Sequence, residues 1–328
     1  MIGTALDLLT GLAAEILHLA LMLAVAPLLV GCIRTLKARL LGRAGPPVMQ
    51  PWRDLIRLAR KRPVLAENAS ALFAAAPAIV FAATLAATAL VPSFTLGMST
   101  APVADLLVIA GLLALGRCTL ALAGMDVGTA FGGIGASRQM SLAVFAEPAL
   151  VLVIFTLALL AGTTNLDGVA AVLAEGPAGV RASLGLAMIA TLAVALSENA
   201  RGPVDGPATR QELGVVRQAM MLEYSGRDLA LIEGAAALKL LAWFTLIGTV
   251  FFPFALATPD AGLLAWPLGI AAWAARTAVL AVALACLETA VARMRLFSVP
   301  EFLGVALLFG LLAAVFLFVG TGVVTGGG

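Results

Sequence analysis

The feature that most constrains this sequence is a series of long apolar runs separated by short polar connections. Eight runs approach or exceed the roughly 20 residues that a helix needs to cross a hydrocarbon core of about 30 Å. They cover about 11–33, 69–92, 103–123, 141–162, 180–200, 229–254, 263–288 and 300–322. Charged residues make up only 12% of the chain, against roughly 25% in soluble domains. The sequence therefore predicts an all-α integral membrane protein with eight transmembrane helices in one polytopic domain, residues 1–328.

Basic residues lie almost entirely in the odd-numbered connections between these runs. Sixteen of the 20 Lys and Arg residues fall there. Because cytoplasmic loops of membrane proteins carry an excess of Lys and Arg, this distribution predicts that the odd connections face the cytoplasm and that both termini lie outside. The N-terminus has no basic segment and no convincing cleavage site, so we expect it to belong to the mature protein.

The first cytoplasmic connection, residues 34–68, combines a Gly/Pro-rich turn at 42–51 with an amphipathic pattern. Apolar side chains recur there at helical spacing, at Trp52, Leu55, Ile56 and Ala59. Basic side chains occupy the other faces, at Arg53, Arg57, Arg60 and Lys61. This pattern predicts a helix that lies in the membrane interface and serves as a docking element. The alternative is a basic loop that only fixes the topology.

The fifth connection, residues 201–228, is also predicted to contain an amphipathic helix. Thr209 and Glu212 fit a capping box at its start. A rough apolar stripe follows at Leu213, Val216, Met220 and Tyr224, and Gly226 is expected to end the helix. The stripe either contacts a partner or packs against the chain's own helices.

Ionisable side chains occur within or at the ends of the apolar runs, where insertion costs about 2.5–3.5 kcal/mol for an Asp, Lys or Arg at a helix centre. They are Arg117, Asp126, Glu147, Glu198, Glu233, Lys239, Arg276 and Glu288. We expect Glu198 to pair with Arg201 one helical turn on, and Glu288 lies close to Arg293. Either the carboxylates form a proton path that leads from the fifth connection, or the charges are ion pairs that orient helices.

Cysteine and histidine usage argues against a metal centre in this chain. Cys32, Cys118 and Cys286 are far apart, and no CxxC or other metal-ligand spacing occurs. The single histidine, His18, excludes haem ligation by paired histidines within the chain. We therefore expect this chain to bind no metal or cofactor of its own.

Several short segments, in this order and at these spacings, resemble those of a known family. They are Gly42 to Pro46, Gln50 to Asp54, Ala123 to Gly128, Gly135 to Arg138, Glu147-Pro148, Ala161 to Asn165, Glu198 to Asp205, Gln211 to Leu213, Glu223 to Gly226, Lys239, and Glu288 to Arg295. Over nearly its whole length the chain resembles the proton-conducting subunit of respiratory complex I that lies next to the soluble arm. It is more similar still to the membrane subunit of hydrogenase-4 and formate hydrogenlyase type nickel–iron hydrogenases.

The resemblance implies a non-catalytic, multi-pass subunit of an oxidoreductase complex in the bacterial inner membrane. Its expected partners are hydrogenase-like large and small subunits, an iron–sulfur protein, antiporter-like membrane subunits and membrane lipid, with no nucleic acid. The nickel–iron centre and the iron–sulfur clusters are expected in those partner subunits. In complex I the corresponding cavity admits quinone, which the hydrogenase relatives do not require.

The candidate site residues fall into three groups. A proton path is expected to use Glu147, Glu198, Asp205, Glu212, Glu223, Glu233, Lys239 and Glu288. Partner docking is expected at Arg43, Gln50, Trp52, Arg53, Asp54, Arg57, Arg138, Arg201 and Tyr224. Structural charge pairing is expected at Arg117, Asp126, Arg276 and Arg293.

The sequence departs from the family pattern at three positions, one in the third connection and two in the fifth. Gln139, Ala208 and Arg210 stand where the family commonly has acidic residues. A glutamine releases no proton at neutral pH, so these replacements predict weaker proton coupling. Two other function classes stay open: a secondary transporter, against which the lack of an inverted repeat argues, and a passive membrane anchor whose charges are simply paired.

Overall fold

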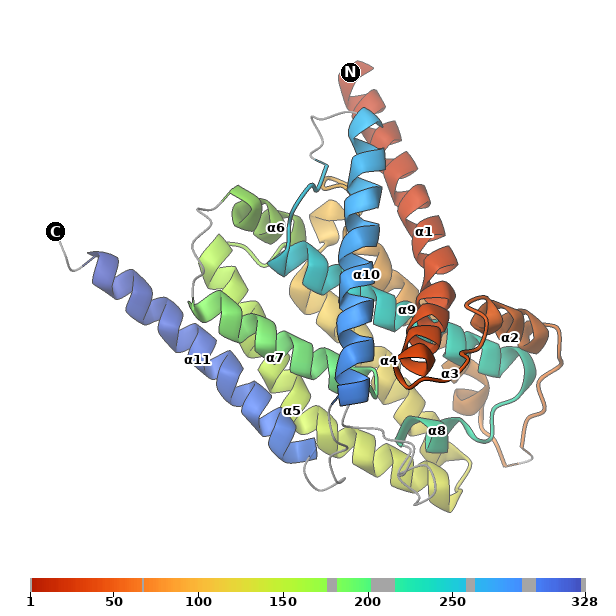
Figure 1. The fold of residues 1–328 in the computed structure, drawn as a ribbon. Helices are drawn as coiled ribbons and strands as arrows, with labels where there is room; N and C mark the ends of the chain where they lie inside the picture. The colour runs from red at the N-terminus through yellow and green to blue at the C-terminus, as the bar shows by residue number, and fades with distance from the viewer. Residues whose placement is uncertain are drawn as a thin grey trace.

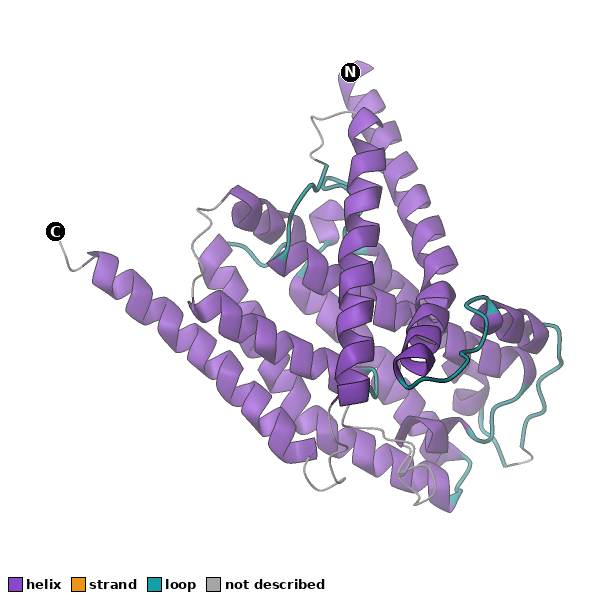
Figure 2. Cartoon of the chain, in the orientation of Figure 1, coloured by secondary structure: helices purple, strands orange, loops and turns teal. Residues whose placement is uncertain are grey.

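The computed structural model describes residues 2–66, 68–175, 182–201, 216–257, 263–290 and 299–325, and all regular elements in these ranges are helices (Figures 1 and 2). The α-helices are α1 (Ile2–Leu40), α2 (Gln50–Ala59), α3 (Ala71–Ala89), α4 (Leu106–Asp126), α5 (Ala130–Ala161), α6 (Leu166–Glu175), α7 (Ala182–Glu198), α8 (Val216–Met221), α9 (Gly226–Phe251), α10 (Trp266–Ala290) and α11 (Val299–Thr325). Two short 3-10 helices, η1 (Ala101–Val103) and η4 (Leu263–Ala265), complete them.

Seven of the described helices are long and apolar enough to cross a membrane, namely α1, α3, α4, α5, α9, α10 and α11. The fifth predicted run, about 180–200, contains α7, which has 17 described residues. At 1.5 Å per residue this helix measures about 26 Å, slightly less than the hydrocarbon core. The chain is thus a multi-pass, all-α membrane protein, and a crossing by α7 stays a prediction.

Helix α9 passes through the centre of the bundle and positions the residues of the candidate site. Sixteen of its 26 residues are buried, and all eleven residues from Leu240 to Val250 are among them. A helix that is apolar on all sides is stable only when other helices surround it. Helices α1, α2, α3, α6, α7 and α10 all pack against α9.

The connections gather on two opposite faces of the bundle. On one face, which we call the basic face, the segment after α2 meets the start of α9, where Val64 N donates to Ser225 Oγ at 2.8 Å. On the other, which we call the opposite face, Leu96 N donates to Ala257 O at 2.9 Å. The first connection thus contacts the fifth, and the second contacts the sixth. This grouping of odd-numbered with odd-numbered and even-numbered with even-numbered connections is what the alternation of basic residues predicted.

The Gly/Pro turn packs tightly against α1. A Cβ on Gly31 would lie 2.0 Å from Val48 O, so only glycine permits this approach. Thr35 Oγ1 donates to Pro46 O at 2.7 Å. These contacts make the segment before α2 a fixed lead-in rather than a loose loop.

Helix α2 confirms the predicted amphipathic helix after Gln50. Pro51 stands in its first turn, where a missing N–H costs nothing. Trp52 Nε1 donates to Ala24 O of α1 at 3.0 Å, one turn before Pro27. Trp52 thereby attaches α2 to α1, while Ile56 stays exposed.

The fifth connection differs from its prediction. Its capping box, Thr209 to Glu212, lies outside the described residues, and α8 spans six residues. Met220 and Tyr224 of the apolar stripe are buried against the chain's own helices. Gly226 does not end a helix but begins α9; its φ is +56°, and a Cβ there would lie 2.6 Å from Arg62 O.

Helix α6 on the opposite face was not predicted, because its ten residues are too few for a membrane run. It begins at Leu166 in the connection between α5 and α7 and packs against α5 and α9. Leu166, Val169 and Ala170 are completely buried.

Candidate functional site

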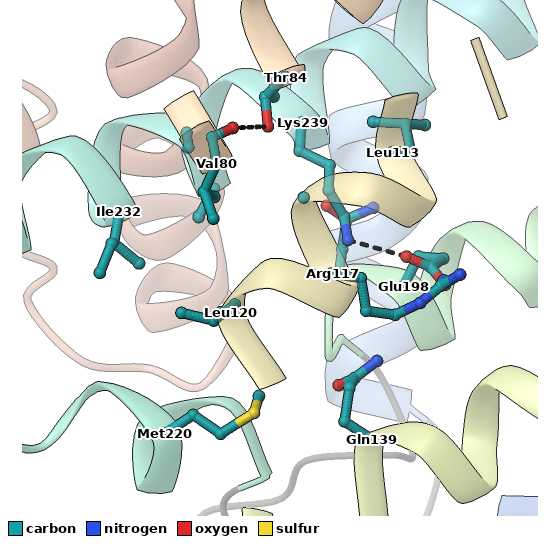
Figure 3. Close-up of a pocket in the computed structure, with 14 residues that line it drawn as sticks. Val80, Thr84, Leu113, Arg117, Leu120, Gln139, Glu198, Met220, Ile232 and Lys239 are labelled. Carbon is teal, nitrogen blue, oxygen red and sulfur yellow. Dashed lines mark hydrogen bonds and ion pairs between the residues drawn. The ribbon is translucent and has the colours of Figure 1, made fainter. Parts of the chain in front are cut away.

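Four charged side chains from four helices meet inside the bundle near the basic face. Arg117 of α4 donates through NH1 to Glu198 Oε1 of α7 and through NH2 to Glu147 Oε1 of α5. Lys239 of α9 donates to the second oxygen of Glu198, Oε2, at 2.8 Å (Figure 3). We call these four residues the Arg117 network. Its two cations and two carboxylates balance in formal charge.

Burial differs strongly between the two carboxylates of the Arg117 network. The Glu198 side chain is 5% exposed and receives both cations, whereas the Glu147 side chain is 49% exposed. A buried carboxylate needs such pairing, because removing an ion from water costs several kcal/mol. Glu147 therefore connects the buried Glu198 to the surface of this chain through Arg117.

The end of α7 determines where Glu198 and Arg201 point. Arg201 N donates to Leu196 O and Ala200 N to Ser197 O, and Ala200 has a φ of +48°. This pattern is a Schellman motif, in which a left-handed residue ends the helix. Arg201 consequently lies beyond the helical geometry that an i,i+3 pair requires. The predicted pair between Glu198 and Arg201 is wrong, since Glu198 binds Arg117 and Lys239 instead.

A cavity of about 60 Å³ adjoins the Arg117 network. Its polar lining includes Arg117, Glu198, Lys239, Gln139 and Asn199 (Figure 3). A water molecule needs about 10–15 Å³ by this measure and two to four polar partners, so the cavity has room for several waters. Gln139, the position at which the family commonly has an acid, thus lies on the wall of this cavity.

A second cluster joins α1, the end of α7 and α10. Lys37 Nζ lies 2.7 Å from Glu288 Oε2, and Arg201 NH1 lies 3.5 Å from Glu288 Oε1. Burial lowers the pKa of Arg201, the negative charges of Glu288 and Glu233 act against this shift, and the neighbouring Arg34 adds to it. We call Lys37, Arg201 and Glu288 the Glu288 cluster. Arg293, the predicted neighbour of Glu288, lies outside the described residues.

Asp126 and Arg276, which were predicted to pair with opposite charges, form hydrogen bonds with backbone groups instead. Arg276 NH1 donates to Phe252 O at 2.9 Å and NH2 to Ser93 O at 3.1 Å. A cation at the C-terminus of α9 complements the helix dipole there. Asp126 Oδ2 accepts from Ser70 N at 2.8 Å. Both residues therefore connect chain segments, as a structural role requires.

The residues predicted to dock a partner are divided between the surface and the interior. Arg43, Arg53 and Arg57 are exposed, and Arg57 NH2 pairs with Asp54 Oδ1 at 3.0 Å. Gln50 Nε2 donates to the same oxygen at 3.1 Å, and Arg138 is half-buried at the start of α5.

Tyr224 was expected on a docking surface and is instead buried. It is 4% exposed, its ring stacks on Phe73 at 4.0 Å, and its hydroxyl donates to Phe73 O at 2.9 Å. Among the acids predicted for the proton path, Glu223 is exposed beside it. Asp205 and Glu212 lie outside the described residues.

Several charged residues with partners in the structure were not singled out from the sequence, and Lys37 and Glu15 are two of them. Lys37 stands within the first basic connection, where nothing local distinguishes it from its neighbours. Glu15 lies inside the first apolar run and is 7% exposed. A single acid in an apolar run was the signal that could have identified it.

Metal binding has no support in the part of the chain that the structure describes. No group of three or more His, Cys, Asp or Glu side chains is placed there to hold a metal ion. The expectation that cofactors reside in partner subunits stays a prediction.

The fold and the site together define a class: a multi-pass, all-helical membrane subunit with cation–carboxylate networks near one face. The family model for NADH dehydrogenase matches residues 13–319, so the chain belongs to this family. Formate hydrogenlyase subunit 4 of Escherichia coli (strain K12) is 32% identical over 295 residues, which cover 90% of this chain and 94% of that protein.

Two further comparisons agree with this assignment. Hydrogenase-4 component C of the same organism is 32% identical over 234 residues, which cover 71% of this chain and 73% of that protein. A chain in the structure of the membrane-bound sulfane sulfur reductase, an archaeal respiratory membrane complex, has the same fold, with a TM-score of 0.78 at 20% identity. That match covers 93% of this chain and 98% of the other. The expected resemblance is confirmed: the chain is a membrane subunit of the complex I-like hydrogenase and oxidoreductase type.

Proposed function

We propose that this chain anchors the soluble redox module of a membrane-bound nickel–iron hydrogenase and provides part of its proton path. The Arg117 network carries the proposal, because it places two carboxylates, a lysine and an arginine from four helices beside a cavity with room for water. The complex would reside in the bacterial inner membrane. Its other subunits would be the large and small hydrogenase subunits, an iron–sulfur protein and antiporter-like membrane subunits.

Proton transfer through the Arg117 network would use the titrating groups and not the arginine. An arginine side chain does not serve as a proton carrier in proteins, so Arg117 fixes the geometry. Glu147 is half exposed and would exchange protons with the surroundings. A proton relayed through water in the cavity would protonate Glu198, which weakens its bond to Lys239 and lets that ammonium turn toward the cavity it lines.

The proton role is tested at Gln139 on the cavity wall. Glutamate at this position adds a titrating group to the cavity, so Gln139→Glu should increase the protons moved per electron pair in reconstituted complexes. Gln139→Leu is the matched control and should decrease that ratio, because it removes a polar partner for cavity water. Equal ratios in both variants and in the wild type would show that protons do not pass this cavity.

Partner docking is tested on α2. Charge reversal at Arg53 and Arg57 should release the soluble partner in mild detergent while the chain still inserts at normal levels. The same reversal at Arg60 and Lys61, also exposed, is a matched control on the same surface. Release by the control pair alone, or loss of insertion in the first variant, would contradict docking at Arg53 and Arg57.

The orientation is also a proposal, because it depends on the distribution of basic residues. Ser99 on the opposite face and Glu223 on the basic face are both exposed. A cysteine at position 99 should react with a reagent confined to the periplasm, and one at position 223 only after the membrane is opened. The reverse result would invert the orientation.

A passive anchor is the second candidate function. The balanced formal charge of the Arg117 network favours it, because fully paired charges orient helices without moving protons. It predicts that Gln139 substitutions change neither proton movement nor turnover.

A further inference from the structure

A separate group of buried polar side chains lies at the opposite face, away from the Arg117 network. Glu15 of α1 is 7% exposed and His18, one turn later, is fully buried. Glu15 Oε2 lies 2.8 Å from Thr100 Oγ1, while the second carboxyl oxygen, Oε1, is buried and has no hydrogen-bond partner among the described residues. A charged carboxylate is expensive in such a place.

The side-chain hydrogen bonds around Thr100 favour one protonation state of Glu15, although the Thr100 backbone N–H stabilises a charged carboxylate there. Thr100 Oγ1 lies 2.8 Å from Glu15 Oε2 and 3.1 Å from Ala89 O. A hydroxyl carries one hydrogen, and both a carboxylate and a carbonyl only accept. If Glu15 is ionised, its carboxylate and Ala89 O have to share the single hydrogen of the Thr100 hydroxyl. If Glu15 carries a proton, its O–H donates to Thr100, whose hydroxyl then donates to Ala89 O at the C-terminal end of α3.

Among the residues that the structure describes, the charged and titratable groups around Glu15 do not supply a counter-ion. His18 is held by two contacts, with Nε2 at 3.0 Å from Thr88 O and Nδ1 at 2.7 Å from Ser93 Oγ. Because a carbonyl only accepts, Nε2 carries the hydrogen, and a neutral ring then accepts from the Ser93 hydroxyl at Nδ1. From α10, Arg276 binds backbone carbonyls. From α6, the Asp167 carboxylate repels a negative charge on Glu15.

We propose that Glu15 is a proton-binding site, a neutral carboxylic acid held by Thr100 that exchanges its proton with the opposite face through Asp167. Asp167 is held beside the loop that contains Thr100, because its Oδ2 accepts from Gly97 N of that loop at 2.7 Å. Burial raises the pKa of Asp167, although the Gly97 N–H partly offsets this effect. The site is separate from the proposed proton path of the Arg117 network and stands without it.

Infrared spectroscopy of the full-length chain in lipid nanodiscs tests the protonation state. A neutral carboxylic acid has a carbonyl band that ionised carboxylates lack. With ¹³C-labelled glutamate at neutral pH, this band should be present in the wild type and lost in Glu15→Gln. A difference spectrum without such a band overturns the proposal, because Glu15 is then ionised. Thr100→Val retains the carboxyl and removes its acceptor, so the band should move to higher wavenumber.

Thr100→Val also decides the case if Glu15→Gln does not fold, since an unmoved acid band overturns the proposal.

The route of the proton to the surface is tested by a separate measurement. After transfer to heavy water, the Glu15 band should shift as its proton is replaced by deuterium. Asp167→Asn should slow that shift severalfold. An unchanged exchange rate in this variant overturns the role of Asp167.

Discussion

The Arg117 network predicts strong energetic coupling between Glu198 and Lys239. Glu198→Gln removes a carboxylate that both Arg117 and Lys239 contact, and leaves Arg117 with the half-exposed Glu147. Removing one member of a buried ion pair typically costs about 3–5 kcal/mol. Lys239 is 18% exposed and lines the cavity, so it can be partly hydrated. We therefore expect a cost near the lower end, about 3 kcal/mol.

A double-mutant cycle measures this coupling. Lys239→Met removes one of two charged donors to Glu198, which should cost about 1.5–3 kcal/mol. In the double variant Arg117 keeps Glu147 and the lysine that faced Glu198 is also gone, so its cost should fall below the sum of the single costs by about 1–3 kcal/mol. The assay is reversible unfolding in mixed detergent micelles. Glu301→Gln, an exposed change on α11, is the control and should be additive with Lys239→Met. Additive costs for Glu198→Gln and Lys239→Met would refute the network.

Three further predictions concern stability. Gly31→Ala should cost about 1–3 kcal/mol in unfolding and loosen α2, because its Cβ would meet Val48 O at 2.0 Å; unchanged stability contradicts the close packing. Tyr224→Phe should cost about 1 kcal/mol through the lost bond to Phe73 O while the stacked rings stay, as a comparison with Tyr224→Ala checks. The pKa of Asp167 is raised above its ordinary value of 3.8, so above pH 3.8 the folded state binds more protons than the unfolded state. The free energy of unfolding should therefore fall as the pH rises from 3.8 through the folded-state pKa. Asp167→Asn should flatten that fall, and an unaltered pH profile would assign it to other groups.

The spacing of apolar residues along the sequence was sufficient to predict the helices that are defined by that spacing alone. The apolar runs gave the long helices, and the spacing from Trp52 to Ala59 gave α2. The fifth connection shows the limit, since the stripe with Met220 and Tyr224 fits a surface helix as well as internal packing. Only the tertiary contacts with Phe73 decide between them.

The charge networks could not be predicted, because their partners are distant in sequence. Lys37 and Glu288 are 251 residues apart, and Arg117 and Glu198 are 81 apart. The near neighbour Arg201 seemed the better partner for Glu198, and a left-handed residue at the end of α7 removed it from reach. The ionisable residues were identified correctly, but their pairing depends on helix packing that single-sequence periodicity does not contain.

The most direct test of the central claim is proton movement in proteoliposomes that contain the whole complex with Glu198→Gln. Glutamine keeps the shape and much of the hydrogen bonding of Glu198 but cannot take up a proton. We expect redox turnover to remain measurable while the pH gradient is lost. A gradient equal to that of the wild type, in a variant with normal assembly, would contradict the account and make Glu198 a structural partner of Arg117 and Lys239.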